Sequence, residues 1–241
     1  MSALGDDDVA IELEGQQAAA AIGRVIEAGA RAQHLVGKRV LASAVDPCGE
    51  CDVCRRGGAA VCPTARRRTA PLTSPVIATA RYVVPIGEPD GIDLPSPAGA
   101  AAAGDLALAY TLYARSGLGP RDPVVVVGDG PVATYLAAVL RAKGIEPVVY
   151  TGDVDAARAV FQTAGIATKP WRVIAASPTA ITEAAALCGP RSTLTVLARD
   201  TSQVIPAATL ALEVTVIPVA GAHPDLIVEA AALVIRGAVE L

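Results

Sequence analysis

Four consecutive valines at positions 124–127 constrain the fold of this chain more than any other feature, because they predict a strand that is buried on both faces. The segment Gly128-Asp129-Gly130 then predicts a tight turn, and the apolar residues at 132–143 predict a helix. Val148-Val149-Tyr150-Thr151 predicts a second strand. A strand, a glycine turn, a helix and a strand in this order are typical of a βαβ unit that places a dinucleotide pyrophosphate at the helix N-terminus.

The turn itself both supports and opposes cofactor binding. Asp129 places a carboxylate inside the turn, where it repels a pyrophosphate unless its side chain points away. Gly152 stands where an acid normally binds the ribose 2′-hydroxyl, and Arg158, the nearest base for a 2′-phosphate, follows two acids. The sequence therefore predicts a doubly wound parallel α/β fold and leaves NAD(P) binding open. The residues expected to face a bound cofactor are Gly128, Gly130, Pro131, Val132 and Gly152.

Composition excludes several classes of function. A net charge of −4 argues against a nucleic-acid-binding surface. No run of 18 apolar residues is free of charges and breaks, and Asp6-Asp7-Asp8 stands where a signal peptide would have basic residues. We therefore expect a cytoplasmic protein with no membrane partner. Arg66-Arg67-Arg68 is the only basic run, and we expect it to be a solvated loop.

Four of the five cysteines lie within fifteen residues, at Cys48, Cys51, Cys54 and Cys62. In a cytoplasmic chain such a cluster indicates a metal site, and four thiolates make a closed tetrahedral site for structural Zn²⁺. An iron–sulfur cluster is the alternative, although the usual spacings are missing. Cys188 stands alone on an expected helix and is interpreted as a small core residue.

The rest of the pattern divides the chain into a β-rich part and an α/β part. Residues 64–98 look irregular apart from one strand, 16–21 could be helical, and the helix at 98–115 is expected to be interrupted near Gly104. Further strands are expected at 9–13, 23–27, 37–42, 81–84, 171–175, 192–197 and 212–218, and further helices at 154–164, 179–187 and 224–236.

These residues resemble the medium-chain dehydrogenase/reductase family, the zinc-containing alcohol dehydrogenases, over about residues 15–241. The resemblance implies a reduced β-rich (GroES-like) lobe at 1–98 with a zinc loop at 48–62. It also implies a Rossmann-like domain at 99–222 and a C-terminal helix at 223–241 that returns toward the first lobe. The similarity rests on Pro47 through Cys62, Gly37-Lys38-Arg39-Val40, Ala109-Tyr110, Gly119-Pro120, the 124–133 segment and His223-Pro224-Asp225-Leu226.

The departures from the family concern its catalytic zinc. The family takes one cysteine from an N-terminal segment that we expect this chain to lack. The histidine of its Gly-His-Glu motif corresponds to Gln16, the glutamate to Gln17, and a second cysteine ligand to Gly104. Amides and glycine do not supply the ligands that Zn²⁺ needs, so no catalytic zinc and no catalytic residue are expected. The cofactor domain also looks shortened between Gly165 and Trp171.

Two hypotheses of function follow, and the sequence leaves both open. The first is a non-catalytic descendant of the family that binds a small molecule, a peptide or a protein partner. The second is a zinc-independent NAD(P)H oxidoreductase in which Tyr110, Tyr113 or Tyr135 polarises a carbonyl or enoyl substrate. Under either hypothesis, the apolar strand at 212–218 is expected to pair at the sheet edge in a homodimer or heteromer.

Overall fold

The computed structural model forms two compact units, one of residues 1–107 with 223–241 and one of residues 108–222. No described helix is long and apolar enough to cross a membrane. The structure describes residues 4–14, 20–68, 72–86, 96–120, 122–150, 152, 172–198, 205–235 and 238–239, without the side chains of 96–101 and 235.

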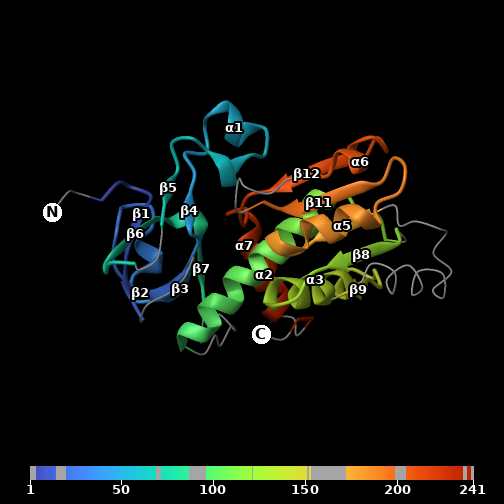
Figure 1. The fold of residues 1–241 in the computed structure, drawn as a ribbon. Helices are drawn as coiled ribbons and strands as arrows, with labels where there is room; N and C mark the ends of the chain where they lie inside the picture. The colour runs from blue at the N-terminus through green and yellow to red at the C-terminus, as the bar shows by residue number, and fades with distance from the viewer. Residues whose placement is uncertain are drawn as a thin grey trace. The chain divides into compact units, whose positions relative to one another are not determined.

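The first unit is built on a five-stranded antiparallel sheet in the order β6-β1-β2-β3-β7 (Figure 1). Valine and isoleucine side chains such as Val9, Ile11, Val25 and Val40 form its core. The predicted β-rich lobe is therefore confirmed. The strands are β1 (Asp8–Leu13), β2 (Ala21–Ala28), β3 (Arg39–Ala42), β6 (Val76–Thr79) and β7 (Val83–Pro85).

Shorter elements complete this unit. A separate two-stranded ribbon of β4 and β5 stands at the base of the cysteine loop, and α1 lies within that loop (Figure 1). Their bounds are β4 (Val45–Asp46), β5 (Arg66–Arg67), α1 (Asp52–Arg55), α7 (Leu226–Ile235) and the 3₁₀ turns η1 (Gln33–Leu35), η2 (Ala59–Val61) and η3 (Ala80–Tyr82).

The arginine run is solvated only in part, because Arg66 and Arg67 are exposed and Arg68 is not. The side chain of Arg68 is 8% exposed, and its Nη2 lies 2.7 Å from Oδ2 of Asp46, whose side chain is 1% exposed. Arg66 pairs with Asp8 at 2.8 Å, and this guanidinium holds the pKa of the Asp8 carboxyl below its usual value. The partners lie 22 and 58 residues away in sequence, so no local pattern identified them. Strands β5 and β6 likewise lie where the sequence looked irregular.

The second unit is a five-stranded parallel sheet in the order β12-β11-β10-β8-β9. Its strands are β8 (Val124–Val127), β9 (Val148–Tyr150), β10 (Arg172–Ala175), β11 (Thr193–Leu197) and β12 (Thr215–Val219). Its helices are the end of α2 (Ser96–Ser116), α3 (Pro131–Ala142), η4 (Pro178–Ala180), α5 (Ile181–Leu187) and α6 (Ala207–Leu210).

Helices cover both faces of this sheet, as the valine run predicts. Val125 and Val127 pack with residues of α5 on one face. Val124 and Val126 pack with residues of α2 and α3 on the other face. The alternation follows from the strand geometry, in which successive side chains point to opposite faces. The predicted doubly wound parallel fold is therefore confirmed.

Helix α2 runs from Ser96 to Ser116 without a break, so the predicted interruption near Gly104 is wrong. One glycine in a helix interior costs about 1 kcal/mol relative to alanine, and the neighbouring alanines favour the helix enough to offset it. Strand β12 begins at Thr215, three residues later than predicted, after Glu213 with φ 56°. The helix predicted at 154–164 lies outside the described residues.

Replacing Gly104 with alanine is expected to stabilise the protein by about 0.5–1 kcal/mol. The added Cβ would meet only the Cβ of Ala20 at 3.9 Å, which is an ordinary contact. Gly144→Ala is the matched control and should destabilise, because Gly144 has φ 76°. Urea unfolding followed by circular dichroism measures both. A loss of stability in Gly104→Ala would contradict the continuous helix.

Replacing Arg68 with glutamine is expected to destabilise the first unit by about 3–5 kcal/mol, because it leaves the buried Asp46 carboxylate without its main partner. Arg31→Gln removes the same charge from an exposed pair with Asp7 and should change stability by less than about 0.5 kcal/mol. The same urea titration compares the two variants. An equal loss of stability in both variants would show that the Arg68–Asp46 pair contributes no more than an exposed ion pair.

Candidate functional site

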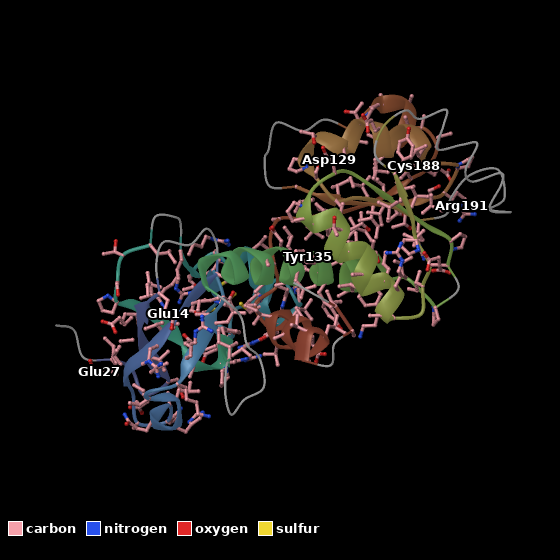
Figure 2. All side chains as sticks on the ribbon, turned by 90° about the horizontal axis from the view of Figure 1, so that it is seen from below. Glu14, Glu27, Asp129, Tyr135, Cys188 and Arg191 are labelled. Atoms are coloured by element: carbon pink, nitrogen blue, oxygen red, sulfur yellow. The ribbon has the colours of Figure 1, made fainter. Side chains whose placement is uncertain are left out.

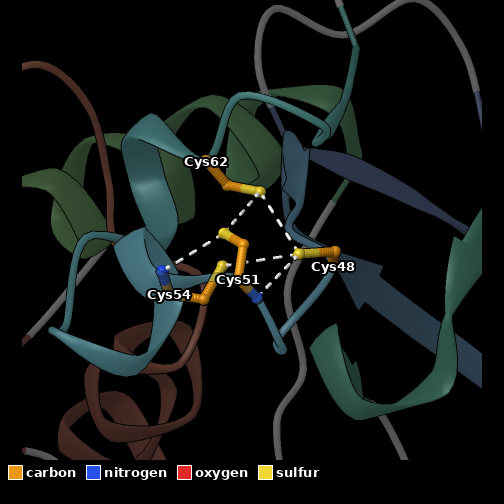
Figure 3. Close-up of side chains that lie close together, drawn as sticks. All are labelled: Cys48, Cys51, Cys54 and Cys62. Atoms are coloured by element: carbon orange, nitrogen blue, oxygen red, sulfur yellow. Dashed lines mark hydrogen bonds between the residues drawn. The ribbon is translucent and has the colours of Figure 1, made fainter.

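The cysteine loop brings four thiols together between β4 and β5 (Figure 3). Cys48 follows β4, Cys51 caps the N-terminus of α1, and Cys54 lies inside that helix. Cys62 ends the η2 turn and is buried. The loop therefore folds back on itself so that residues fourteen apart in sequence come into contact.

The spacing of the sulfurs fits a tetrahedral metal ion. The Sγ–Sγ distances are 4.0 Å for Cys48–Cys54, 3.9 Å for Cys51–Cys62 and 3.7 Å for Cys48–Cys62. Four sulfurs at Zn–S distances of about 2.3 Å lie about 3.8 Å apart at the corners of a tetrahedron. A disulfide would need an S–S distance of about 2.05 Å. All five cysteines are free, and the four-cysteine cluster is consistent with a structural zinc site.

Backbone hydrogen bonds reach two of these sulfurs. The backbone N–H of Cys51 donates to Sγ of Cys48, and that of Cys54 donates to Sγ of Cys51. The Thr64 hydroxyl and the backbone N–H of Cys51 lower the pKa of Cys48 to about 6. Burial raises the pKa of Cys54 to about 12. In the absence of metal, Cys48 is therefore a thiolate at neutral pH and Cys54 keeps its proton.

Residues distant in sequence hold the cysteine loop from outside. The Nε2 atom of His223 lies 3.2 Å from the carbonyl oxygen of Gly57, and its Nδ1 lies 3.9 Å from Asp225. Asp225 also pairs with Arg81 at 3.3 Å. The contact between His223 and Gly57 has no local sequence signal, because the two residues are 166 positions apart.

The glycine turn of the second unit has the backbone expected of a phosphate loop. Gly128 has φ 135° and Gly130 has φ 92°, and both values favour glycine. Pro131 occupies the first position of α3, where a missing N–H costs nothing. The backbone N–H groups of Val132 and Ala133 then have no acceptor within the helix. Gly130 caps the helix, and a Cβ added to it would meet no atom within 4 Å.

A cavity of about 340 Å³ lies at this turn, at the carboxyl ends of β8 and β9. Carboxylate side chains of Asp129 and Glu183 line it, and among the described residues no lysine or arginine does. Gly152 also lines the cavity, with φ 149°, so the predicted ribose position offers no acid. The backbone of this site fits a pyrophosphate, whereas its charge opposes one. The lining consists of Gly128, Asp129, Gly152, Thr179, Ala180 and Glu183.

Two of the three candidate tyrosines contact the far end of α3. Lys143, which follows the last residue of that helix, lies 5.2 Å from the ring of Tyr110 and 5.9 Å from that of Tyr113. Helix α3 has twelve residues and is about 18 Å long, so these rings lie far from the glycine turn at its N-terminus. Tyr135 is in the second turn of α3 and packs against the core beneath it (Figure 2).

The positions that correspond to the family's catalytic zinc are described only in part. Gln16 and Gln17 lie outside the described residues. Gly104 lies on α2, and its nearest neighbour is Ala20. Within the described part of the chain, the four-cysteine cluster is the only group of acidic, histidine or cysteine residues arranged to hold a metal.

Comparison with solved structures identifies the architecture. An oxidoreductase/dehydrogenase of unknown specificity from Escherichia coli matches with a TM-score of 0.80 and 15% identity over 100% of this chain and 84% of its own. The alcohol dehydrogenase of Thermus sp. ATN1 matches with a TM-score of 0.78 and 17% identity over 100% of this chain and 85% of its own. A protein described as a short chain alcohol dehydrogenase, from Escherichia coli CFT073 and in complex with its cofactor NADH, matches with a TM-score of 0.75 and 15% identity over 100% of this chain and 83% of its own.

No protein-family model matches the sequence. The structural matches extend along the whole chain, through the antiparallel lobe, the cysteine loop and the parallel sheet. At 15–17% identity they establish the fold and leave the activity open. The chain has the fold of the medium-chain zinc alcohol dehydrogenases.

Proposed function

We propose that this chain is a non-catalytic binding protein on a dehydrogenase fold, with its first unit stabilised by a structural zinc. Its occupant would be a small molecule, a peptide or a protein partner. One observation carries this proposal, namely the acidic cavity at the glycine turn. Asp129 and Glu183 stand where a dinucleotide would place its pyrophosphate, and the described lining offers no compensating base.

The order of the described strands fits a dinucleotide-binding sheet. Such a sheet has the strand order 3-2-1-4-5-6. Here β9, β8, β10, β11 and β12 correspond to strands 2, 1, 4, 5 and 6. Strand 3 would fall within residues 153–171, which lie outside the description. The sheet therefore leaves dinucleotide binding open, and the charge of the cavity carries the proposal.

The absence of a catalytic zinc belongs to the same proposal. Gly104 has no ligand atom, and it lies inside a continuous helix beside Ala20. Gln16 and Gln17 carry amides in place of the family's histidine and glutamate. A zinc ion held by such residues would lack the charged and imidazole ligands that it prefers. Zinc-dependent alcohol oxidation is therefore not expected of this chain.

A zinc-independent NAD(P)H oxidoreductase is the second candidate, and the retained glycine turn favours it. Positive φ values at Gly128 and Gly130 keep a backbone suited to a phosphate. A bound nicotinamide would supply the hydride, and this chain would have to orient it and polarise the substrate. Tyr110 and Tyr113 contact Lys143 at the opposite end of α3, which leaves Tyr135 as the candidate donor.

We also propose that β12 forms a subunit interface. It is a terminal strand of the parallel sheet, and Val216 and Ile217 on it are partly exposed. An unpaired strand edge is a template for a second chain. Pairing with an identical copy would give a homodimer, and pairing with a different chain would give a heteromer.

The four cysteines are expected to bind one zinc ion per chain. Cys62→Ala should abolish zinc binding, whereas Cys188→Ala, the matched control, should leave it intact because Cys188 is buried beside α5. Metal analysis after dialysis measures the zinc content. Zinc retained by Cys62→Ala would contradict the assignment.

Zinc affinity is expected to fall with decreasing pH, because zinc binds thiolates in competition with protons. At pH 7 the ion must displace the proton of Cys54, whose metal-free pKa is about 12. Below about pH 6, Cys48 also takes up a proton and the competition steepens. Dialysis between pH 8 and pH 5 against a weak chelator, followed by metal analysis, tests this. A zinc content that rises on acidification would refute it.

NADH and NADPH are expected to bind the zinc-loaded protein with dissociation constants of about 1 mM or weaker. Each carboxylate in the cavity opposes the pyrophosphate by on the order of 1 kcal/mol. The double variant Asp129→Ser, Glu183→Gln should therefore bind at least about tenfold more tightly. Glu146→Gln removes one exposed carboxylate outside the cavity and is the control.

Calorimetric titration measures the affinity of the unmodified chain, the double variant and the control for NADH and NADPH. Micromolar binding by the unmodified chain would overturn the proposal and favour the oxidoreductase. Carbonyl and enoyl substrates would then be assayed for NAD(P)H consumption.

A further inference from the structure

A second cavity lies where the strands of the parallel sheet begin, at the end of the sheet opposite the glycine turn. We call this end, formed by the amino ends of the strands, the amino edge. Its volume of about 500 Å³ falls in the range of small-molecule sites. Arg172 begins β10, and its registered neighbours Val124 and Thr193 begin β8 and β11. Figure 2 labels Arg191 at this edge and Asp129 at the other. The lining consists of Asp122, Pro123, Arg172 and Arg191.

The guanidinium of Arg172 is held in place by two neighbours. Its Nη1 donates to the hydroxyl of Thr193, and its Nε lies 3.6 Å from the carboxylate of Asp122. Asp122 is itself fixed, because its Oδ2 accepts the backbone N–H of Gly119 at 3.0 Å. These contacts use Nε and Nη1, and no described residue accepts a hydrogen bond from Nη2. A fixed guanidinium with a remaining donor is suited to a planar or tetrahedral anion.

The second arginine is placed by a strained backbone. Arg191 has φ 59°, and among the described residues only it and Glu213 have a positive φ without being glycine. Arg191 stands third in the turn from Gly189 to Ser192, a position that favours glycine, and Ser192 N–H donates to the Gly189 carbonyl. Such strain costs on the order of 1–3 kcal/mol and clusters at functional sites. Despite this cost, the chain has arginine and not glycine at position 191, and the Arg191 side chain lines the cavity.

The charges at this edge are available to a ligand. Arg191 and Glu213 are 4.0 Å apart, and both side chains are more than 80% exposed. An exposed pair at that distance contributes little, so an incoming anion competes with it easily. Two guanidiniums and one carboxylate line this cavity, whereas two carboxylates line the cavity at the glycine turn. Anionic ligands are therefore favoured at the amino edge.

We propose that the cavity at the amino edge binds a small molecule through a phosphate group held between Arg172 and Arg191. A phosphate offers both guanidiniums strong acceptors at once. The Oδ1 atom of Asp122 can accept a hydroxyl of the same ligand. This site lies at the opposite edge of the sheet from the glycine turn, so the test of the dinucleotide cavity does not decide it.

Inorganic phosphate is the probe for the test, titrated by calorimetry into the zinc-loaded full chain at constant ionic strength. Arg191→Gly removes the guanidinium and suits φ 59°, so its melting temperature should be unchanged or higher. Its phosphate affinity should fall at least about tenfold, because a charge-assisted contact is lost. Arg172→Gln should weaken binding similarly. Arg141→Gln, which removes an exposed arginine paired with Glu146, should bind like the unmodified chain.

Three outcomes would overturn the proposal. The first is no phosphate binding by the unmodified chain at millimolar concentration. The second is equal phosphate affinity in Arg191→Gly and Arg141→Gln, which would leave only general charge attraction. The third is succinate binding as tightly as phosphate, which would assign the site to carboxylates.

Discussion

The burial of β8 on both faces is the constraint on which the second unit depends. All four valines of β8 are fully buried, and helices pack on each side of the sheet. Polar groups that act on a ligand must therefore lie at the two ends of the strands. Because the strands are parallel, their amino ends all lie at one edge of the sheet and their carboxyl ends all lie at the other. One edge carries Gly128 and Asp129, and the other carries Asp122 and Arg172.

The distribution of charge between these edges decides what each can bind. A helix N-terminus such as that of α3 is equivalent to about half a positive charge. Asp129 and Glu183 together place two carboxylates at the same cavity. Both residues are exposed, so solvent weakens their effect, but the two carboxylates still oppose the favourable charge of the helix. A glycine turn with the correct backbone can therefore be a poor site for a pyrophosphate, while the amino edge with its two arginines suits an anion.

Features predicted correctly from the sequence are those whose cause is local. A run of valines marks a buried strand, and four cysteines at short spacing mark one metal-binding loop. Other features were missed because a distant partner decides the outcome. Arg68 becomes a buried residue because Asp46 lies on the strand paired with β5, and His223 contacts Gly57 across 166 residues. The cavity at the amino edge was missed for the same reason, since Arg172 and Arg191 approach only when β10 and β11 pair.

Zinc and cofactor place different demands on this fold. The cysteine loop has almost no apolar burial of its own, since α1 has no buried residue and η2 has only Ala59. Such a loop depends on a bound ion to offset its loss of conformational entropy. The parallel sheet, in contrast, buries apolar side chains on both of its faces. The four thiolates therefore matter more to the folding of their loop than a dinucleotide would to the folding of the sheet. The four thiols lie in one unit and the acidic glycine turn lies in the other. The proposal that this chain binds a ligand without hydride transfer rests on that combination.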